Sequence, residues 1–202
     1  MTDSPSPKTN PYSASKLAEG DSGASPRPNL AVRGAIFFTI SIVGCAVDLF
    51  TKAWIFSWPR GPGAQGEWWI VEPYFGIQHA LNQGALWGMG QGRVAMFAGL
   101  SILAACGILY WVFFGGAARD RWLTVTLALV LGGILGNLYD RLGLWGGQGP
   151  DGATIYAVRD WILFRYGEWV WPNFNIADCL LVVGAFLLAW HSLRAPANQS
   201  PS

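Results

Sequence analysis

The chain has 202 residues, of which 52% are hydrophobic and only 12% charged, and it contains 12 tryptophans and 11 phenylalanines. This composition is too apolar for an ordinary soluble domain and predicts an integral membrane protein. The net charge of +1 provides neither a basic surface nor an acidic tail, which argues against a nucleic-acid-binding function.

The chain divides into two polar tails and one apolar body. Residues 1–29 are rich in serine and proline, a composition that cannot bury a core, so we expect a disordered tail there. Residues 30–194 should form the membrane domain, and residues 195–202 a short C-terminal tail. Because the first apolar run begins only after Arg33, we interpret it as a retained span and not as a cleaved signal peptide.

Four apolar stretches are long enough to cross a bilayer, which takes about 20 residues. They are residues 34–56, 94–114, 122–138 and 174–193. Four spans place both termini on one side of the membrane. Arginines cluster near the span ends on that side and favour a cytoplasmic location for both termini: Arg33, Arg119, Arg121 and Arg194.

Two longer connections, residues 57–93 and 143–173, should lie at the outer face. In the first, "EWWIVEPYFGIQHALNQGALWG" has the aromatic and β-branched content of short strands broken by Gly and Pro. In the second, "TIYAVRDWILFRYGEW" mixes apolar, aromatic and charged residues, as an amphipathic interfacial segment does.

The polar exceptions in and near the spans all fall at this outer end. They are Asp48, Lys52, Asn82, Asn137, Asp140, Arg141, Asp160, Asn175 and Asp178. Charged residues within a membrane usually face the bundle interior, pair with each other and mark a functional site. Structural explanations remain open: Asp48 and Lys52 have the i,i+4 spacing of an ion pair on one helix face, and Asn175 suits a helix N-terminus. Asn137 and Arg141 have the same spacing and would anchor a helix end.

Carboxylates are the side chains best suited to carry chemistry here. The three cysteines lie in apolar stretches without zinc-ligand spacing, and no H-E-x-x-H motif occurs, so we expect no metal and no cofactor. No serine lies in a G-x-S-x-G motif, which argues against a serine hydrolase. Two carboxylates held close together in a low-dielectric site share one proton. The ionised one activates water while the other donates to a carbonyl oxygen, which is aspartyl protease chemistry.

Four motifs resemble those of the lipoprotein signal peptidases, the signal peptidase II family of aspartyl proteases. "VDLFTKAW", "NQGALWG", "GNLYDR" and "FNIADCLL" are similar to the family's D-x-x-T-K, N-x-G-A-x-x, G-N-x-x-D-R and F-N-x-A-D, in the same order. The resemblance implies a four-helix membrane bundle with a small extracytoplasmic β-cradle and an interfacial helix, which we class as an all-α membrane fold. It also implies an enzyme of the bacterial inner membrane that cuts diacylglyceryl-modified prolipoproteins before the lipidated cysteine. We expect it to act as a monomer in contact with membrane lipids.

The resemblance further implies that Asp160 and Asp178 are the catalytic pair. Carried over in the same way, Asp48, Lys52, Asn82, Asn137, Arg141 and Asn175 become supporting and substrate-orienting residues, and Asp140 a structural neighbour. The sequence departs from the family at Arg159, in place of the second valine of V-V-D, and at Trp87, in place of phenylalanine. An insertion, "LGLWGGQGPDGAT", precedes Asp160 and leaves Asp140 as the alternative member of the pair. Arg159 would lower the pKa of Asp160 if their side chains met.

Two other functional classes remain as alternatives. In a small transporter, Asp48, Asp140 and Asp178 would relay protons or bind a cation. Polar residues through the whole membrane depth would favour that hypothesis, whereas the inner halves of the spans are nearly uncharged. In an assembly protein without chemistry, the aspartates would tolerate replacement by asparagine.

Overall fold

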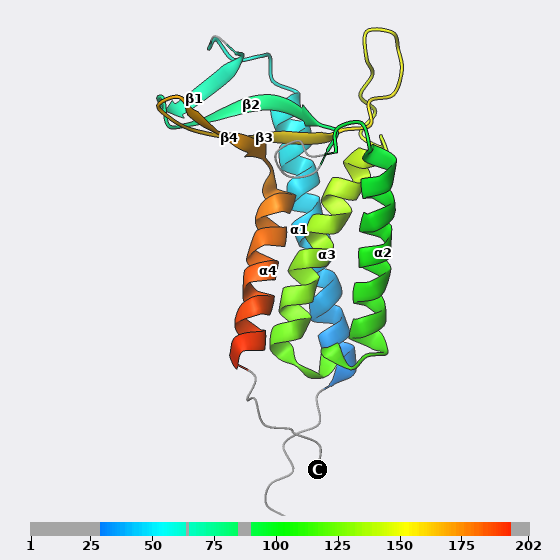
Figure 1. Cartoon of the computed structure of the whole chain (residues 1–202). Helices are drawn as coiled ribbons and strands as arrows, with labels where there is room; N and C mark the ends of the chain where they lie inside the picture. The colour runs from blue at the N-terminus through cyan, green and yellow to red at the C-terminus, as the bar shows by residue number, and fades with distance from the viewer. Residues whose placement is uncertain (1–28, 64, 85–89, 195–202) are drawn as a thin grey trace, which may run out of the picture.

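The computed structural model describes residues 29–63, 65–84 and 90–194 (Figure 1). Four long helices lie side by side: α1 (Leu30–Phe56), α2 (Val94–Phe113), α3 (Arg121–Arg141) and α4 (Ile176–Arg194). A short 3-10 helix, η2 (Ala117–Arg119), connects α2 to α3. All four long helices are long and apolar enough to cross a membrane. Trp87 and the two tails, apart from Asn29, lie outside the described residues.

Helix α3 lies at the centre of the bundle and packs against α1, α2 and α4. Its glycines permit this close packing. A Cβ atom on Gly132 would lie 3.0 Å from the carbonyl oxygen of Ser41 on α1, and one on Gly133 would lie 2.6 Å from that of Ala177 on α4. Small residues at such contacts let membrane helices approach each other closely. Around α3 the buried core includes Phe37, Ile108, Val112, Leu127 and Leu131.

The two outer connections form one antiparallel sheet in the order β1-β2-β3-β4. Its strands are β1 (Glu67–Val71), β2 (Phe75–Asn82), β3 (Val158–Tyr166) and β4 (Trp169–Phe174). Figure 1 shows the sheet across the end of the bundle opposite to the start of α1 and the end of α4. Pairing of β2 with β3 joins the two connections and places Ala80 opposite Asp160. Because β4 leads almost directly into α4, the sheet also fixes where α4 begins.

The small antiparallel sheet agrees with the predicted β-cradle, but the all-α class is not confirmed, because the fold combines helices with a sheet. Residues 154–169, which we expected to be an amphipathic interfacial segment, instead supply β3 and the start of β4. The outer connections contain no helix within residues 57–63, 65–84, 90–93 and 142–175. The second connection forms a strand because β2 offers a free edge to which β3 can pair. This pairing gives hydrogen-bond partners to backbone N–H and C=O groups that would otherwise be unpaired near lipid.

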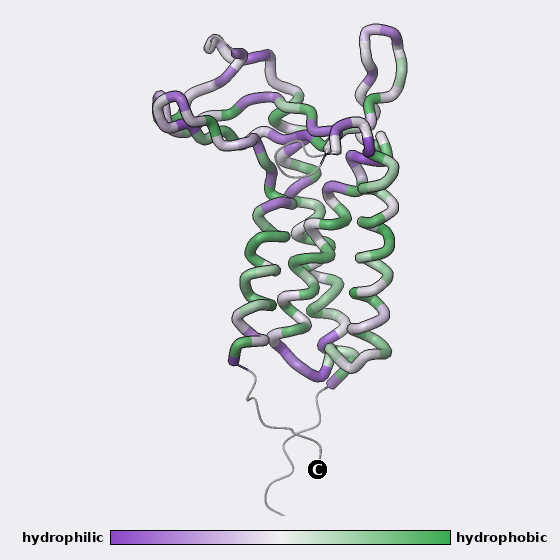
Figure 2. Tube along the Cα trace, viewed as in Figure 1, coloured by the Kyte–Doolittle hydropathy of each residue, from purple (hydrophilic) through white to green (hydrophobic). Residues whose placement is uncertain are grey.

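Hydropathy follows the axis of the bundle. Figure 2 shows apolar residues along the middle of the helices and polar residues at both ends. Large apolar side chains are exposed on the outer surfaces of α1, α2 and α4, among them Phe50, Leu103, Val182 and Phe186. The inserted segment, residues 142–154, lies in a loop that stands above the ends of α2 and α3 (Figure 1).

Candidate active site

Two carboxylates, Asp160 on β3 and Asp178 in the first turn of α4, line one cavity of about 420 Å³. Asn82 at the end of β2, and Asn137 and Arg141 near the end of α3, line the same cavity. Apolar side chains of β4 and α4 supply much of the remaining wall: Phe174, Leu181 and Val182. A few convergent polar groups within an apolar cavity are typical of a substrate site.

Asn175 bonds to both carboxylates. Its Nδ2 donates to Asp160 Oδ1 at 2.6 Å. Its side-chain oxygen accepts from the backbone N–H of Asp178 at 3.0 Å, while Asp178 Oδ2 accepts from the backbone N–H of Asn175 at 3.2 Å. These reciprocal bonds form a capping box at the start of α4. The structural explanation for Asn175 therefore holds, and the same residue also bridges the two aspartates.

Asn137 connects the cavity to a buried lysine. Its Nδ2 donates to Asp178 Oδ1 at 2.8 Å, and its Oδ1 accepts from Lys52 Nζ at 2.9 Å and from Asn175 Nδ2 at 3.1 Å. Because its oxygen accepts from two donors, the orientation of the Asn137 amide is fixed with Nδ2 toward Asp178.

Asp160 is held by amide donors and is only 2% exposed. Asn82 Nδ2 donates to its Oδ2 at 3.1 Å, while Asn175 donates to its Oδ1. Burial raises the pKa of Asp160, and the neighbouring Asp178 raises it further, to about 7. The two amide donors and the positive charge of Lys52 act in the opposite direction. Near neutral pH Asp160 is therefore available as a proton donor.

Asp140 does not line this cavity, and its carboxylate instead pairs with Arg159. The Arg159 side chain donates to both of its oxygens, with Nη2 2.8 Å from Oδ1 and Nε 3.3 Å from Oδ2. The backbone N–H of Arg159 also donates to Oδ2, at 2.9 Å. Successive side chains on a strand point to opposite faces, so Arg159 reaches Asp140 while Asp160 faces the cavity. The condition for Arg159 to lower the pKa of Asp160, a meeting of their side chains, is therefore not fulfilled, because the guanidinium is paired with Asp140.

Asp48 and Lys52 form the predicted ion pair, with Lys52 Nζ 2.7 Å from Asp48 Oδ2. Asp48 Oδ1 also accepts from the backbone N–H of Ala177 at 2.9 Å, which ties α1 to the first turn of α4. A Cβ atom on Gly136 would collide with the Asp48 carboxylate, so this contact depends on a glycine in α3. Both residues thus support the site from behind.

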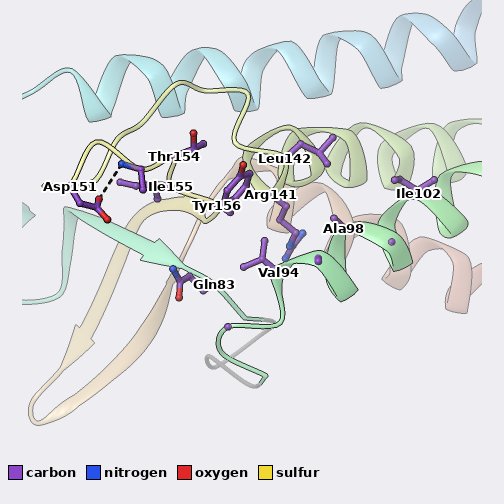
Figure 3. Close-up of a pocket in the computed structure, with 15 residues that line it drawn as sticks. Gln83, Val94, Ala98, Ile102, Arg141, Leu142, Asp151, Thr154, Ile155 and Tyr156 are labelled. Carbon is purple, nitrogen blue, oxygen red and sulfur yellow. Dashed lines mark hydrogen bonds between the residues drawn. The ribbon is translucent and has the colours of Figure 1, made fainter.

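Arg141 lies between the first cavity and a second one of about 820 Å³, and its side chain lines both. Figure 3 shows it between Val94 and Ala98 of α2 and Tyr156, which follows the inserted segment. Its guanidinium lies 5.8 Å from the ring centroid of Phe97. It is therefore the predicted site residue best placed to meet a substrate that occupies both spaces.

The structure brings together all the predicted site residues, and it adds two contacts that the sequence did not predict. Arg159 is the partner of Asp140, and Trp145 of the inserted loop stacks on Arg159, with the guanidinium 5.0 Å from its ring centroid. Neither contact had a clear sequence signal, because the strand at Arg159 was not predicted. Within the described parts of the chain, no three His, Cys, Asp or Glu side chains come together as a metal site would require.

Comparisons with known proteins agree on one family. The sequence profile of a family described as signal peptidase (SPase) II matches residues 40–194. A lipoprotein signal peptidase of Rhodopirellula baltica is 51% identical over 78% of this chain and 71% of its own length. One from Symbiobacterium thermophilum is 34% identical over 75% of this chain and 90% of its own length.

Solved structures show a similar fold. A structure described as a bacterial membrane enzyme has a TM-score of 0.66 and 23% identity, and the match covers 82% of this chain and 92% of that one. A second structure with the same description has a TM-score of 0.63 and covers 79% of this chain and 94% of that one.

Proposed function

Because the chain belongs to the signal peptidase II family, we propose that Asp160 and Asp178 are the catalytic pair of an aspartyl endopeptidase. As a lipoprotein signal peptidase, the protein removes signal peptides from prolipoproteins. One observation carries the proposal: two carboxylates from separate elements line one cavity, and the single side chain of Asn175 bonds to both residues. Asp140 has no comparable position, because Arg159 occupies both of its oxygens.

The two aspartates have different roles in this mechanism. Asp178 accepts from the Asn137 amide and the Asn175 backbone N–H, which orient its carboxylate, and we assign it as the base that removes a proton from water. Asp160, with its pKa near 7, is the protonated member and donates to the oxygen of the scissile carbonyl. Water adds to the carbonyl carbon, the C–N bond then breaks, and the leaving nitrogen takes a proton from the pair.

The proposed substrate carries diacylglycerol on the cysteine that follows the cut. An apolar groove of about 750 Å³ lies beside the catalytic cavity, between the β3-β4 hairpin and α4. Phe174, Asp178 and Val182 line both spaces, so the groove leads to the pair. Aromatic side chains such as Tyr166 and Trp169 form its wall, as is common where proteins meet the membrane interface. An acyl chain in this groove would hold the scissile bond at the depth of the cavity.

The transporter hypothesis is not supported. Among the described residues, the buried charged side chains lie in the sheet or in the halves of the helices next to it. The buried polar residues in the other halves are neutral: Ser41, Thr124 and Thr126. A proton or cation path would need polar groups through the whole depth of the bundle.

We further propose that the protein lies in the bacterial inner membrane as a monomer, in contact with lipid, with both termini cytoplasmic and the catalytic cavity near the outer face. Arg33, Arg119, Arg121 and Arg194 gather at the end of the bundle away from the sheet. At the sheet end, Arg159 is paired with Asp140. The connection between α2 and α3 at the other end is short, so basic residues are denser there than in the long connections of the sheet end, and this density favours the cytoplasm for that end.

The test is cleavage by the purified protein in lipid or detergent. The substrates are one prolipoprotein with diacylglycerol on its cysteine and the same chain without the lipid, and mass spectrometry locates the cut. We expect cleavage before the modified cysteine, and none with Asp178→Asn. Equal cleavage of the unmodified chain would refute the lipid requirement, and cleavage by Asp178→Asn would refute the assigned pair.

A further inference from the structure

Four charged side chains form a buried cluster behind the catalytic cavity. Asp48 and Lys52 come from α1, Asp140 from α3 and Arg159 from β3, and we call these four the buried ion cluster. The side chains of the first three are fully buried, and that of Arg159 is 5% exposed. Two positive and two negative charges balance, which a buried cluster needs because an uncompensated charge there is strongly unfavourable.

Lys52 is shared between the cluster and the catalytic pair. Its Nζ lies 2.7 Å from Asp48, 3.4 Å from Asp140 and 2.9 Å from the side-chain oxygen of Asn137. Through Asn137 it fixes the amide that donates to Asp178. The position of one ammonium group therefore decides how one catalytic carboxylate is held.

Arg159 determines how strongly Asp140 competes for that ammonium group. At present Asp140 accepts from Nη2 and Nε of Arg159, and Lys52 is its more distant cationic partner. Without the guanidinium, Lys52 would face two buried carboxylates alone. Opposite charges attract strongly in a low dielectric, so Asp140 would draw Lys52 away from Asn137.

The inserted segment covers this guanidinium. Trp145 places its ring centroid 5.0 Å from Arg159 Cζ, and Phe56 at the end of α1 places its own at 6.0 Å. The two rings meet edge to face, with centroids 6.3 Å apart. Aromatic faces attract a cation and exclude water from it. Arg159 and Trp145 of the inserted segment thus meet in one contact.

We propose that Arg159, covered by Trp145 of the inserted segment, is a positioning residue for the catalytic pair. By neutralising Asp140 it keeps Lys52 on Asn137, and Asn137 in turn holds Asp178. Its backbone N–H, bonded to Asp140, fixes β3 immediately before Asp160. This inference rests on the proposed function, because its effect is measured on cleavage.

The test compares Arg159→Val with a matched control at the other end of the bundle. Arg194, the exposed last residue of α4, also stacks on a tryptophan, with its Cζ 4.3 Å from the Trp190 ring centroid, and it lines neither the catalytic cavity nor the groove. We expect Arg159→Val to lower kcat by about tenfold to a hundredfold with little change in KM. The substitution displaces the Asp178 carboxylate through Lys52 and Asn137 but removes no contact with the substrate. Arg194→Val should cut like the wild type.

A charge-balanced double variant separates positioning from general damage to the fold. Arg159→Val with Asp140→Asn removes one charge of each sign and leaves Lys52 with Asp48, so kcat should recover most of the loss. The inference is wrong if Arg159→Val cuts normally, or if the double variant is as slow as the single one. A general loss of folding would lower the yield and the thermal midpoint without this recovery.

A milder variant serves where Arg159→Val does not fold. Trp145→Ala removes the stacked ring and should lower kcat about two- to fivefold at unchanged KM, the range expected for one cation–π contact. Leu144→Ala, at its exposed neighbour, is the control. Normal kcat in Trp145→Ala overturns the role of the insertion. Wild type and Asp178→Asn are run in parallel: a wild type that does not cut, or an Asp178→Asn that does, refutes the proposed function and not this inference.

Discussion

Replacing Asn175 by serine should separate its role as a helix cap from its role at the catalytic pair. Serine is a good N-cap residue, so its hydroxyl can accept from the backbone N–H of Asp178. It has no amide to donate to Asp160, where the present contact is 2.6 Å. Asn175→Ala removes both functions, and both substitutions remove similar side-chain volume, so the difference between them isolates the cap.

The loss of this donor should change the pH dependence of cleavage. Donation from Asn175 lowers the pKa of Asp160, so its removal raises that pKa above about 7. A hydrogen bond to a charged group is worth about 1.5–3 kcal/mol, and one pKa unit corresponds to about 1.36 kcal/mol. With Asn82 still donating, we expect a rise of about one unit. Asp160 then stays protonated to higher pH, so the alkaline limb of kcat moves up by about one pH unit.

The assay is kcat against pH from about 5 to 10 for wild type, Asn175→Ser and Asn175→Ala, with thermal unfolding on the same preparations. The alkaline limb should move equally in both variants. Only Asn175→Ala should lose the cap, worth about 1 kcal/mol or about 2–4 °C in the unfolding midpoint. An unmoved or lowered alkaline limb in both variants would refute the assignment of Asp160 as the proton donor.

Three other predictions concern packing, substrate binding and protonation. Gly136→Ala should destabilise the protein by about 1–3 kcal/mol because its Cβ would collide with the Asp48 carboxylate. The Cβ of Gly107→Ala would meet open space, so this control should not be destabilised. Thermal unfolding of both variants tests the prediction. Arg141→Lys should raise KM about tenfold with a smaller effect on kcat, since lysine does not reproduce the planar fork of arginine; an unchanged KM would remove Arg141 from the substrate path. Folding raises the pKa of Asp160 from 3.8 to about 7, so its protonation stabilises the folded state at low pH. This stabilisation should be lost as pH rises from about 4 to about 7 in wild type and be absent in Asp160→Asn, and equal pH dependence of the two unfolding midpoints would contradict it.

The helices were predictable from sequence because lipid imposes a simple requirement, a long run of apolar residues. All four apolar stretches are helices, although α1 starts at Leu30 and α3 extends to Arg141, beyond the predicted ends. Polar residues at a helix end, such as Asp140 and Arg141, break the hydropathy pattern without breaking the helix. Strand β3 was missed for a different reason: its residues are buried on both faces near Val158, so they do not alternate cleanly between apolar and polar.

The grouping of the polar residues at one end also followed from sequence, because alternating spans fix which ends meet. The pairing within that group did not. Whether Arg159 meets Asp140 or Asp160 depends on the face of a strand, and a shift of one residue exchanges the two. The roles of Asn137 and Asn175 as bridges depend on side-chain positions to within about an ångström. Spacing along the chain does not specify positions that closely.

Cleavage of a diacylglyceryl-modified prolipoprotein by three asparagine variants tests the central claim most directly. The wild type, Asp160→Asn, Asp178→Asn and Asp140→Asn proteins are purified under the same conditions and compared by the mass shift of the substrate. The catalytic pair proposed here predicts no cleavage by Asp160→Asn or Asp178→Asn, and slower but measurable cleavage by Asp140→Asn. An inactive Asp140→Asn beside an Asp160→Asn that cuts normally would contradict it.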